Sequence, residues 1–410
     1  MILALLSLAP SGARAASVGH FRLALSTPPR LQGIGSGVSY VVLQPWEQAE
    51  ARRLRQRDPG LKVLVYQDFG SMTAGLGPDA QSSSGVPFRT ATRQHPDWFL
   101  ADGRGRRIQE RGYPYLFMAD VGNPGYRRRW TTDVLHLLRH GPWSGVFMDD
   151  VNTTPRPEAG SAVIAGYPTD SAYQAAVRGM LAYAASRIRG TGRLTIANMG
   201  GWVDHPAVVR SWLRYVDGAM DEKFVKYSPA PGQGYIGVSG WLSQLREVTS
   251  TVAMDKTFLA VTAARPTDAQ AQLYGWASLL LAGDGHAAYL AATAYTGAEP
   301  ALPAYRTRLG APAGSMHRLR GGAYARSFAD GLVLVNPTAH TVRVSLATLR
   351  GSRLARASQT TMRPHTGLVL ARAAARRRSP ARRWPLVAAL ALAAALVLLL
   401  WWRRPRSGRR

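Results

Sequence analysis

The sequence predicts an α/β fold: a (β/α)8 TIM barrel followed by a small C-terminal antiparallel β-sandwich and one transmembrane helix. Three observations predict it. Eight short apolar runs alternate with helix-length amphipathic stretches, shorter strand-like runs follow after about residue 304, and an uncharged apolar segment of nineteen residues lies near the C-terminus. The 410 residues are enough for one barrel of about 250 residues and a smaller module.

Eight apolar runs are expected to form the barrel strands. They are largely continuous rather than alternating, which is typical of parallel strands covered on both faces. The runs are Val38–Pro45, Leu61–Asp68, Tyr115–Val121, Gly145–Asp150, Leu194–Asn198, Val216–Glu222, Thr257–Thr262 and His286–Ala291. Right-handed crossovers between eight such repeats predict a closed barrel. An open doubly wound sheet is the alternative, but no glycine-rich phosphate-binding loop follows the first run.

Six amphipathic stretches between these runs are expected to be helices. They are Trp46–Arg57, Asn123–Arg139, Asp170–Arg189, His205–Tyr215, Gly240–Thr251 and Thr267–Ala282. Asn123-Pro124 is typical of a helix start, because proline is favoured at the first helical position. The Gly-, Ser- and Pro-rich stretch Gly70–Pro96 follows the second run, which places it over the C-terminal face of the barrel, where active sites are built.

The two ends of the chain carry targeting and anchoring signals. Met1–Leu8 is apolar, and Ala13-Arg14-Ala15 fits a small-x-small cleavage site. Trp384–Trp402 has the length of a transmembrane helix, with tryptophans at its ends and arginines beyond them. We therefore expect a single-pass protein of the cell membrane with an extracytoplasmic body. Arginines flank the helix on both sides, so the orientation depends on the N-terminal signal.

These signals divide the chain into six parts. We expect a signal peptide (1–15), the barrel (16–304), the β-sandwich module (305–371), a basic linker (372–383), the transmembrane helix (384–402) and a cytoplasmic basic tail (403–410). Within the module, Asp330-Gly331 is typical of a tight hairpin turn between two short strands.

The composition excludes several kinds of chemistry. The chain has no cysteine, which rules out disulfides, thiolate metal sites and cysteine nucleophiles. Its nine histidines are dispersed without the spacing of a zinc motif, so we expect no metal site and no cofactor. The net charge of +27 comes partly from the arginine-rich tail and partly from scattered arginines, without a nucleic-acid-binding motif. No nucleic acid partner is therefore expected, and the oligomeric state is left open.

Two apolar runs end in pairs of carboxylates. Gly145–Asn152 contains Asp149 and Asp150, and Val216–Phe224 contains Asp221 and Glu222. Strand alternation places Asp149 on the face of Phe147, and Glu222 on the face of Met220, with Asp221 opposite. Glycoside hydrolysis needs two carboxyl groups facing each other across the scissile bond. We therefore expect Asp149 to be the nucleophile or base and Glu222 the proton donor, unless these acids cap helices or pair with arginines.

Other polar and aromatic side chains lie in, at or just after the expected strand ends. Sugars bind to aromatic platforms and to fixed hydrogen-bonding groups, so these residues are expected to bind substrate, although aromatic side chains at such positions also pack in cores. They are Tyr40, Trp46, Tyr66, Asp68, Asp120, Asp150, Asn198, Trp202 and Tyr235.

The chain resembles a known family at several of these places. The resemblance lies in Gly-Val-Phe-Met-Asp-Asp-Val at 145–151, Ala-Asp-Val-Gly-Asn-Pro-Gly-Tyr at 119–126, Asn198, and the Asp-Gly…Glu of 217–222. These features are similar to those of the hypothetical glycosyl hydrolases of family 15, which in turn are similar to polygalactosaminidase-like barrels. The resemblance spans about residues 38–371 and implies a TIM barrel, glycan hydrolysis, and a catalytic Asp and Glu at Asp149 and Glu222.

These observations lead to one hypothesis and two alternatives. The main hypothesis is a membrane-anchored extracytoplasmic glycoside hydrolase that cleaves a polysaccharide with an Asp/Glu pair, with retention at an α-linkage as its extension. The first alternative is a catalytically inactive barrel that binds glycan as a surface receptor or scaffold. The second is a basic membrane protein that contacts nucleic acid or anionic lipid, whose binding would weaken steeply with salt.

Overall fold

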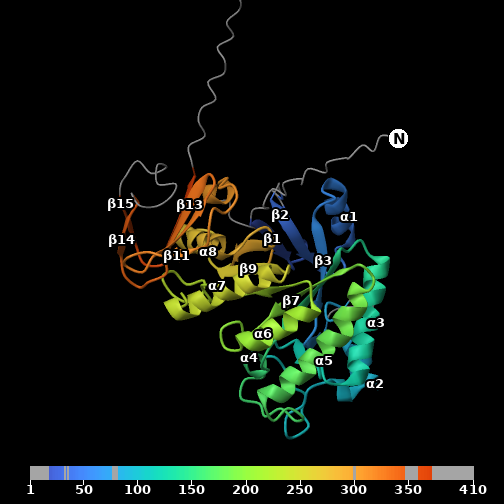
Figure 1. The fold of residues 1–410 in the computed structure, drawn as a ribbon. Helices are drawn as coiled ribbons and strands as arrows, with labels where there is room; N and C mark the ends of the chain where they lie inside the picture. The colour runs from blue at the N-terminus through green and yellow to red at the C-terminus, as the bar shows by residue number, and fades with distance from the viewer. Residues whose placement is uncertain are drawn as a thin grey trace, which may run out of the picture. The chain divides into compact units, whose positions relative to one another are not determined.

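The computed structural model describes residues 18–371 apart from 32–33, 35–36, 76–81, 299–301 and 347–358. Eight parallel strands close into a barrel, and each pairs with the next barrel strand along the chain until β10 closes on β1 (Figure 1). They are β1 (Gly19–Ala24), β2 (Val38–Leu43), β3 (Lys62–Asp68), β6 (Gly145–Val151), β7 (Leu194–Met199), β8 (Gly218–Asp221), β9 (Thr257–Ala263) and β10 (Ala287–Ala292).

The predicted barrel is confirmed, with one strand exchanged. Seven of the eight expected runs contain a barrel strand, but the first strand is β1, which the sequence did not reveal because His20 and Arg22 interrupt its apolar character. The run Tyr115–Val121 holds β5 (Leu116–Met118) instead, which pairs antiparallel with β4 (Ser71–Thr73) outside the barrel. Barrel closure buries Arg22, and a local pattern cannot anticipate such burial.

Helices connect the barrel strands where amphipathic stretches were expected. The longer ones are α1 (Gln48–Arg57), α3 (Pro124–His140), α5 (Asp170–Arg189), α6 (Pro206–Trp212), α7 (Val238–Ala253) and α8 (Ala269–Ala282). Asn123 caps α3 by accepting the amides of Gly125 and Tyr126, and Asp268 caps α8 by accepting that of Ala271. Both helix starts thus follow the rule that a short polar side chain satisfies the first free amides.

The barrel has an inner and an outer core, and strand alternation decides which side chain enters each. The inner core contains one or more residues from every barrel strand (Phe21, Leu23, Val42, Leu64, Phe147, Ile196, Met220, Leu259, Val261, Ala288 and Leu290). Residues two positions later on the same strands share this face. Polar side chains near the strand ends can therefore project into the C-terminal mouth.

A long insertion between β3 and β6 lies beyond the C-terminal end of β3. It contains β4, β5, α2 (Phe88–Gln94) and the 3-10 turn η2 (Pro96–Trp98). The expected loop Gly70–Pro96 therefore holds a strand and a helix. Three further short elements follow later in the chain: α4 (Arg156–Ala159), η3 (Leu213–Tyr215) and η4 (Pro303–Arg306).

Two antiparallel sheets follow the barrel. A four-stranded sheet has the order β11 (His317–Arg318), β12 (Tyr324–Phe328), β13 (Gly331–Asn336) and β16 (Thr366–Ala371). One face of it packs on α8, where Gly367 lies too close to Ala277 and Leu273 for any larger side chain (Figure 1). The other face shares a hydrophobic cluster with the two-stranded sheet of β14 (Val342–Ser345) and β15 (Gln359–Met362).

The predicted fold class added one transmembrane helix to the barrel and the β-sandwich, and the structure corrects it: the described residues form the barrel and the two sheets without a membrane-spanning helix. In the part of the chain that the structure describes, no helix is both long and apolar enough to cross a membrane. Helix α5 has 20 residues but carries Asp170 and three arginines. Helix α8 is apolar but has 14 residues, about 21 Å against a hydrocarbon core of about 30 Å.

Several expectations, including the stretch predicted to form this helix, concern residues that the structure does not describe. The predicted signal peptide (1–15), linker (372–383), transmembrane segment (384–402) and tail (403–410) all lie outside the described residues. The extracytoplasmic location that depended on them stays a prediction.

Asn336 connects the two C-terminal sheets, and its removal should destabilise the protein. The side chain is fully buried; Nδ2 donates to the carbonyls of His340, Met362 and Arg363, and Oδ1 accepts the amide and hydroxyl of Thr338. We expect Asn336→Ala to lower the free energy of unfolding by about 3 kcal/mol, because buried polar groups lose their partners. Chemical denaturation measures this.

The exposed Arg343 on β14 provides the control for this variant. Arg343→Ala should change the free energy of unfolding by less than about 0.5 kcal/mol, as surface substitutions usually do. Equal losses in the two variants would show that Asn336 does not hold the sheets together.

Candidate active site

Asp149 and Glu222 lie next to each other at the C-terminal end of the barrel. The side-chain amide of Asn198 donates to both: Nδ2 is 2.8 Å from Asp149 Oδ1 and 2.9 Å from Glu222 Oε2. These two oxygens are therefore at most 5.7 Å apart, the sum of the two bond lengths. The structure thus brings together three of the residues expected from the sequence.

Three neighbouring strands position this group. Asp149 is on β6, Asn198 is on β7, and Glu222 follows β8 directly. The residues two positions earlier on these strands all belong to the inner core of the barrel (Phe147, Ile196 and Met220). The three polar side chains therefore continue the column of inward-facing residues into the mouth, as strand alternation requires.

A tyrosine hydroxyl supports each carboxylate. Tyr66 on β3 donates to Asp149 Oδ2 at 2.6 Å, and Tyr295, three residues after β10, donates to Glu222 Oε1 at 2.5 Å. The backbone amide of Asp150 is 3.1 Å from Asp149 Oδ1. Asp149 thus accepts three hydrogen bonds, and Glu222 accepts two.

Opposing influences act on the ionisation of Asp149. Burial raises the pKa of its carboxyl above the usual range, and the nearby Glu222 raises it further. The hydrogen bonds from Tyr66, Asn198 and the Asp150 amide act in the opposite direction, because they favour the charged form.

A second group of carboxylates adjoins the first. One oxygen each from Asp68, Glu110 and Asp150 lies within 4.8 Å of the others. Asp68 Oδ1 accepts the backbone amides of Gly70 at 3.0 Å and Ser71 at 2.7 Å, and the Ser71 hydroxyl donates to Glu110 Oε1. Burial, followed by the neighbouring carboxylates, raises the pKa of Asp68 and Asp150 well above the usual range.

A local irregularity in β6 explains how two consecutive carboxylates serve different groups. The pairing of β6 with β7 shifts register between Met148 and Val151, and Asp150 has a φ of 56°. This left-handed conformation is uncommon for a residue with a side chain. Gly70 lies directly against this bend, where a Cβ atom would be 2.8 Å from the Asp150 carbonyl oxygen.

Two residues expected to bind substrate have described contacts only with residues other than the two carboxylates. Tyr40 is inside the barrel, but its hydroxyl pairs with Thr257 Oγ1 at 2.8 Å at the beginning of β9, which is the opposite end from the mouth. Trp46 lies beyond the C-terminal end of β2, where its indole donates to Thr27 Oγ1 at 3.0 Å. Its described contacts do not include Asp149 or Glu222.

Three further expected binding residues have structural contacts instead. Trp202 is 3% exposed and donates to the Met220 carbonyl at 3.0 Å, so it packs as a core residue. Tyr235 stacks on His365 with ring centroids 4.3 Å apart. Asp120 accepts the Tyr167 hydroxyl and the Gly122 amide, which lie in loops near α3 and α5. An aromatic or acidic residue just beyond a strand can turn to either side, so alternation no longer decides its position.

The sequence analysis missed three residues at the mouth: Glu110, Tyr113 and Tyr295. Tyr295 follows the last barrel strand, so a search for polar residues after every strand could have found it. Glu110 and Tyr113 lie in the insertion between β4 and β5, where no periodic pattern marks them. Tyr113 is 53% exposed, and burial followed by the charge of Glu222 raises its pKa, so the two side chains are close enough to interact electrostatically.

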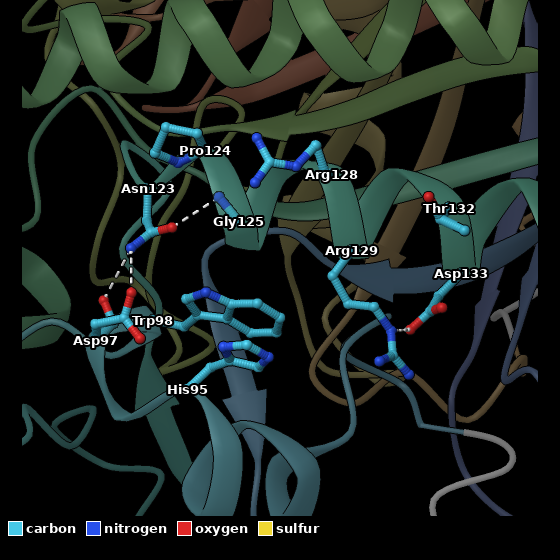
Figure 2. Close-up of a pocket in the computed structure, with 10 residues that line it drawn as sticks. All are labelled: His95, Asp97, Trp98, Asn123, Pro124, Gly125, Arg128, Arg129, Thr132 and Asp133. Atoms are coloured by element: carbon cyan, nitrogen blue, oxygen red, sulfur yellow. Dashed lines mark hydrogen bonds and ion pairs between the residues drawn. The ribbon is translucent and has the colours of Figure 1, made fainter.

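A separate pocket lies at the N-terminus of α3. It encloses about 880 Å³ and is lined by His95, Asp97, Trp98, Asn123, Pro124, Gly125, Arg128, Arg129, Thr132 and Asp133. Figure 2 shows the stacked rings of His95 and Trp98 on one side and the Arg129–Asp133 ion pair on the other. None of the mouth carboxylates lines it, so the chemistry is assigned to the mouth and not to this pocket.

The chain has similarities to solved glycosidase structures. The glycoside hydrolase domain of PelA from Pseudomonas aeruginosa is 14% identical, with 69% of this chain and 97% of that chain covered and a TM-score of 0.48. The cyclic α-maltosyl-(1→6)-maltose hydrolase of Arthrobacter globiformis is 15% identical, with 87% and 99% covered and a TM-score of 0.45. Aspergillus fumigatus Ega3, solved with galactosamine, is 12% identical, with 70% and 95% covered and a TM-score of 0.39.

At identities and TM-scores this low, the similarity transfers neither a substrate nor a mechanism to this chain. No curated protein matches the sequence. The family comparison is decisive, because the model of hypothetical glycosyl hydrolase family 15 matches residues 55–332, more than half of the chain and most of the barrel. The chain therefore belongs to hypothetical glycosyl hydrolase family 15, and it is a glycoside hydrolase.

Proposed function

We propose that the protein cleaves a polysaccharide with retention of configuration, with Asp149 as nucleophile and Glu222 as acid and base. The observation that carries the proposal is the shared hydrogen bond of Asn198, which keeps the two nearest carboxylate oxygens within 5.7 Å. Retaining glycosidases hold their carboxyl groups about 5–5.5 Å apart, whereas inverting ones leave about 6.5–9.5 Å for a water molecule. The separation at the mouth favours direct attack by a carboxylate.

The hydrogen bonds favour this division of roles. Asp149 accepts three donors, which stabilise a carboxylate ready to attack the anomeric carbon. Glu222 gives its proton to the departing glycosidic oxygen as the bond to the anomeric carbon breaks. It then takes a proton from water as the water attacks the glycosyl–Asp149 ester, which restores both carboxyl groups.

Exposed aromatic side chains at the mouth support a polymeric substrate. Tyr113 is 53% exposed and Tyr115 is 50% exposed, and their rings pack edge to face at 6.2 Å. Because Tyr113 is close enough to Glu222 to interact with its charge, the pair offers apolar faces on which sugar rings beyond the cleaved bond can stack. We extend the proposal to an α-linkage, because the nucleophile Asp149 lies on the fourth barrel strand and the acid Glu222 directly follows the sixth.

The test is hydrolysis by the full chain of a panel of α- and β-linked polysaccharides and oligosaccharides, followed by proton NMR of the first product formed. We expect new reducing ends from an α-linked substrate and an α-anomer that appears before mutarotation. A β-anomer from an α-linked substrate would contradict retention. Binding of glycans without new reducing ends, across the panel, would contradict the catalytic assignment itself.

Tyr66→Phe should move the acidic limb of the pH profile to higher pH. The Tyr66 hydroxyl favours ionised Asp149, so its loss raises the pKa of Asp149 further, and a larger share of the nucleophile is protonated at a given acidic pH. The profile of kcat/KM against pH measures this. Tyr40→Phe is the control, because it removes a hydroxyl from the same lumen at the other end; an equal shift there would exclude a local effect.

A further inference from the structure

We propose that Asp68, Glu110 and Asp150 bind a divalent cation, and that the geometry suits Ca²⁺. This site is distinct from the proposed catalytic pair, although it adjoins Asp149. It differs from the expectation of no metal site, which considered histidine motifs and did not include Glu110.

The spacing of the oxygens matches the size of a calcium ion. Calcium holds oxygen ligands at about 2.3–2.6 Å, so two ligands of one ion are at most about 5 Å apart. The three carboxylates each offer an oxygen within 4.8 Å of the others. Magnesium, which binds at about 2.0–2.1 Å, would need all of them within about 4.2 Å. The three oxygens therefore lie within the span that calcium ligands can have.

A buried oxygen of Asp68 without a hydrogen-bond partner in the described part of the chain is a second, independent reason to expect a cation here. Asp68 is 1% exposed, and the two backbone amides it accepts both bind Oδ1. Its other oxygen, Oδ2, is buried and has no hydrogen-bond partner among the described residues. A buried carboxylate oxygen without a donor or a cation costs several kcal/mol. A metal ion between the three carboxylates would satisfy it.

Among the described residues, no positively charged side chain neutralises these three carboxylates through an ion pair. The ion pairs found in the described ranges do not include Asp68, Glu110 or Asp150. The three carboxyl groups come from β3, the insertion and β6, so one ion would connect three segments of the mouth. Asp150 is half-buried, whereas the other two are buried, which makes its side the route of entry.

The cation would also support the neighbouring nucleophile. The backbone amide of Asp150 donates to Asp149 Oδ1 at 3.1 Å, so an ion bound to the Asp150 side chain would fix the position of this donor. Its positive charge would offset the negative charges that gather beside Asp149. Calcium should therefore mainly increase the stability of the protein, with a smaller increase in turnover.

Terbium luminescence and thermal unfolding of the full chain test the proposal. Terbium replaces calcium at oxygen sites and emits when a nearby indole is excited. The Trp130 indole donates to the backbone carbonyl of Asp68 at 2.8 Å, which places it beside the site. After treatment with EDTA, we expect terbium emission that calcium displaces. We also expect Ca²⁺ at 100 times its Kd to raise the Tm by about 5 °C, with less effect from Mg²⁺.

Four variants localise the effect. Asp68→Asn and Glu110→Gln should each lose the Tm response to calcium and most of the terbium emission. Trp130→Phe should lose most of the emission and keep the Tm response. Asp58→Asn, an exposed acid in the loop between α1 and β3 at the other end of the barrel, should keep both.

Two results would overturn the proposal. One is a Tm of the EDTA-treated wild-type chain that does not respond to calcium at neutral pH, a measurement that needs no variant to fold. The other is a response that Asp68→Asn and Glu110→Gln both retain. If the carboxyl groups instead share protons, stability should increase as the pH falls and calcium should have no effect, because raised pKa values favour the protonated folded state. Terbium emission and the Tm response to calcium do not depend on catalysis. They can therefore still be measured if the retaining mechanism or the catalytic assignment proves wrong.

Discussion

Asp149→Asn should reduce kcat by about 10⁴- to 10⁶-fold, the range seen when a covalent nucleophile is removed. An amide attacks the anomeric carbon poorly and carries no charge to stabilise an oxocarbenium-like transition state. The nearly isosteric side chain still faces Tyr66 and Asn198, so the fold and substrate binding should be retained. Initial rates on a cleaved polysaccharide, measured beside unfolding curves, give the result.

A control separates the loss of a nucleophile from the loss of a negative charge. Asp58→Asn removes an exposed carboxylate at the other end of the barrel and should keep kcat within about twofold, as expected of a distant surface substitution. If Asp149→Asn keeps more than about a tenth of wild-type turnover, Asp149 does not form a glycosyl ester.

Glu222→Gln should reduce turnover of a natural glycan by about 10²- to 10⁴-fold, the usual contribution of general acid–base catalysis. The loss should depend on the leaving group. An aryl glycoside with an acidic phenol leaves without a proton, so the first step should be nearly normal and the glycosyl ester should accumulate. Azide needs no general base and should restore turnover by attacking this ester. Stopped-flow release of the phenol and identification of the glycosyl azide measure both effects.

Asp221→Asn is the matched control for Glu222→Gln. Asp221 precedes Glu222 directly, but it faces the outer core, where it accepts the Gln244 side chain at 2.6 Å and the Lys223 amide at 2.9 Å. Burial raises its pKa to about 7. Its replacement should alter stability and not the leaving-group dependence. Azide rescue of Asp221→Asn, or its absence in Glu222→Gln, would contradict the assigned roles.

Strand alternation, which is a local rule, predicted that Asp149 and Glu222 would face the barrel mouth, and the structure brings both side chains to Asn198 there. Asp149 and Glu222 each lie two residues after an inward-facing apolar residue, and the barrel places the ends of β6 and β8 on one side of the mouth. Asn198 followed from the same rule on β7. Their catalytic roles stay proposals until the variants are measured.

The remainder of the site depends on contacts that no local rule describes. Glu110 reaches the mouth from an insertion between β4 and β5, and its position follows from the pairing of those short strands. Trp202 and Tyr235 were expected to bind sugar, but beyond a strand end they fold back onto Phe258 and His365. Strand β1 was missed because His20 and Arg22 interrupt its apolar run, although closure of the whole barrel half-buries the first and buries the second.

Helix α8 belongs to two cores at once, which determines how the protein can be shortened. Ten of its fourteen residues are buried, because one side covers β9 and β10 while another lies under β13 and β16. A chain cut before residue 305 would leave an apolar helix face open to water and should aggregate. The smallest piece suited to expression and crystallisation therefore ends after Ala371, with both C-terminal sheets retained.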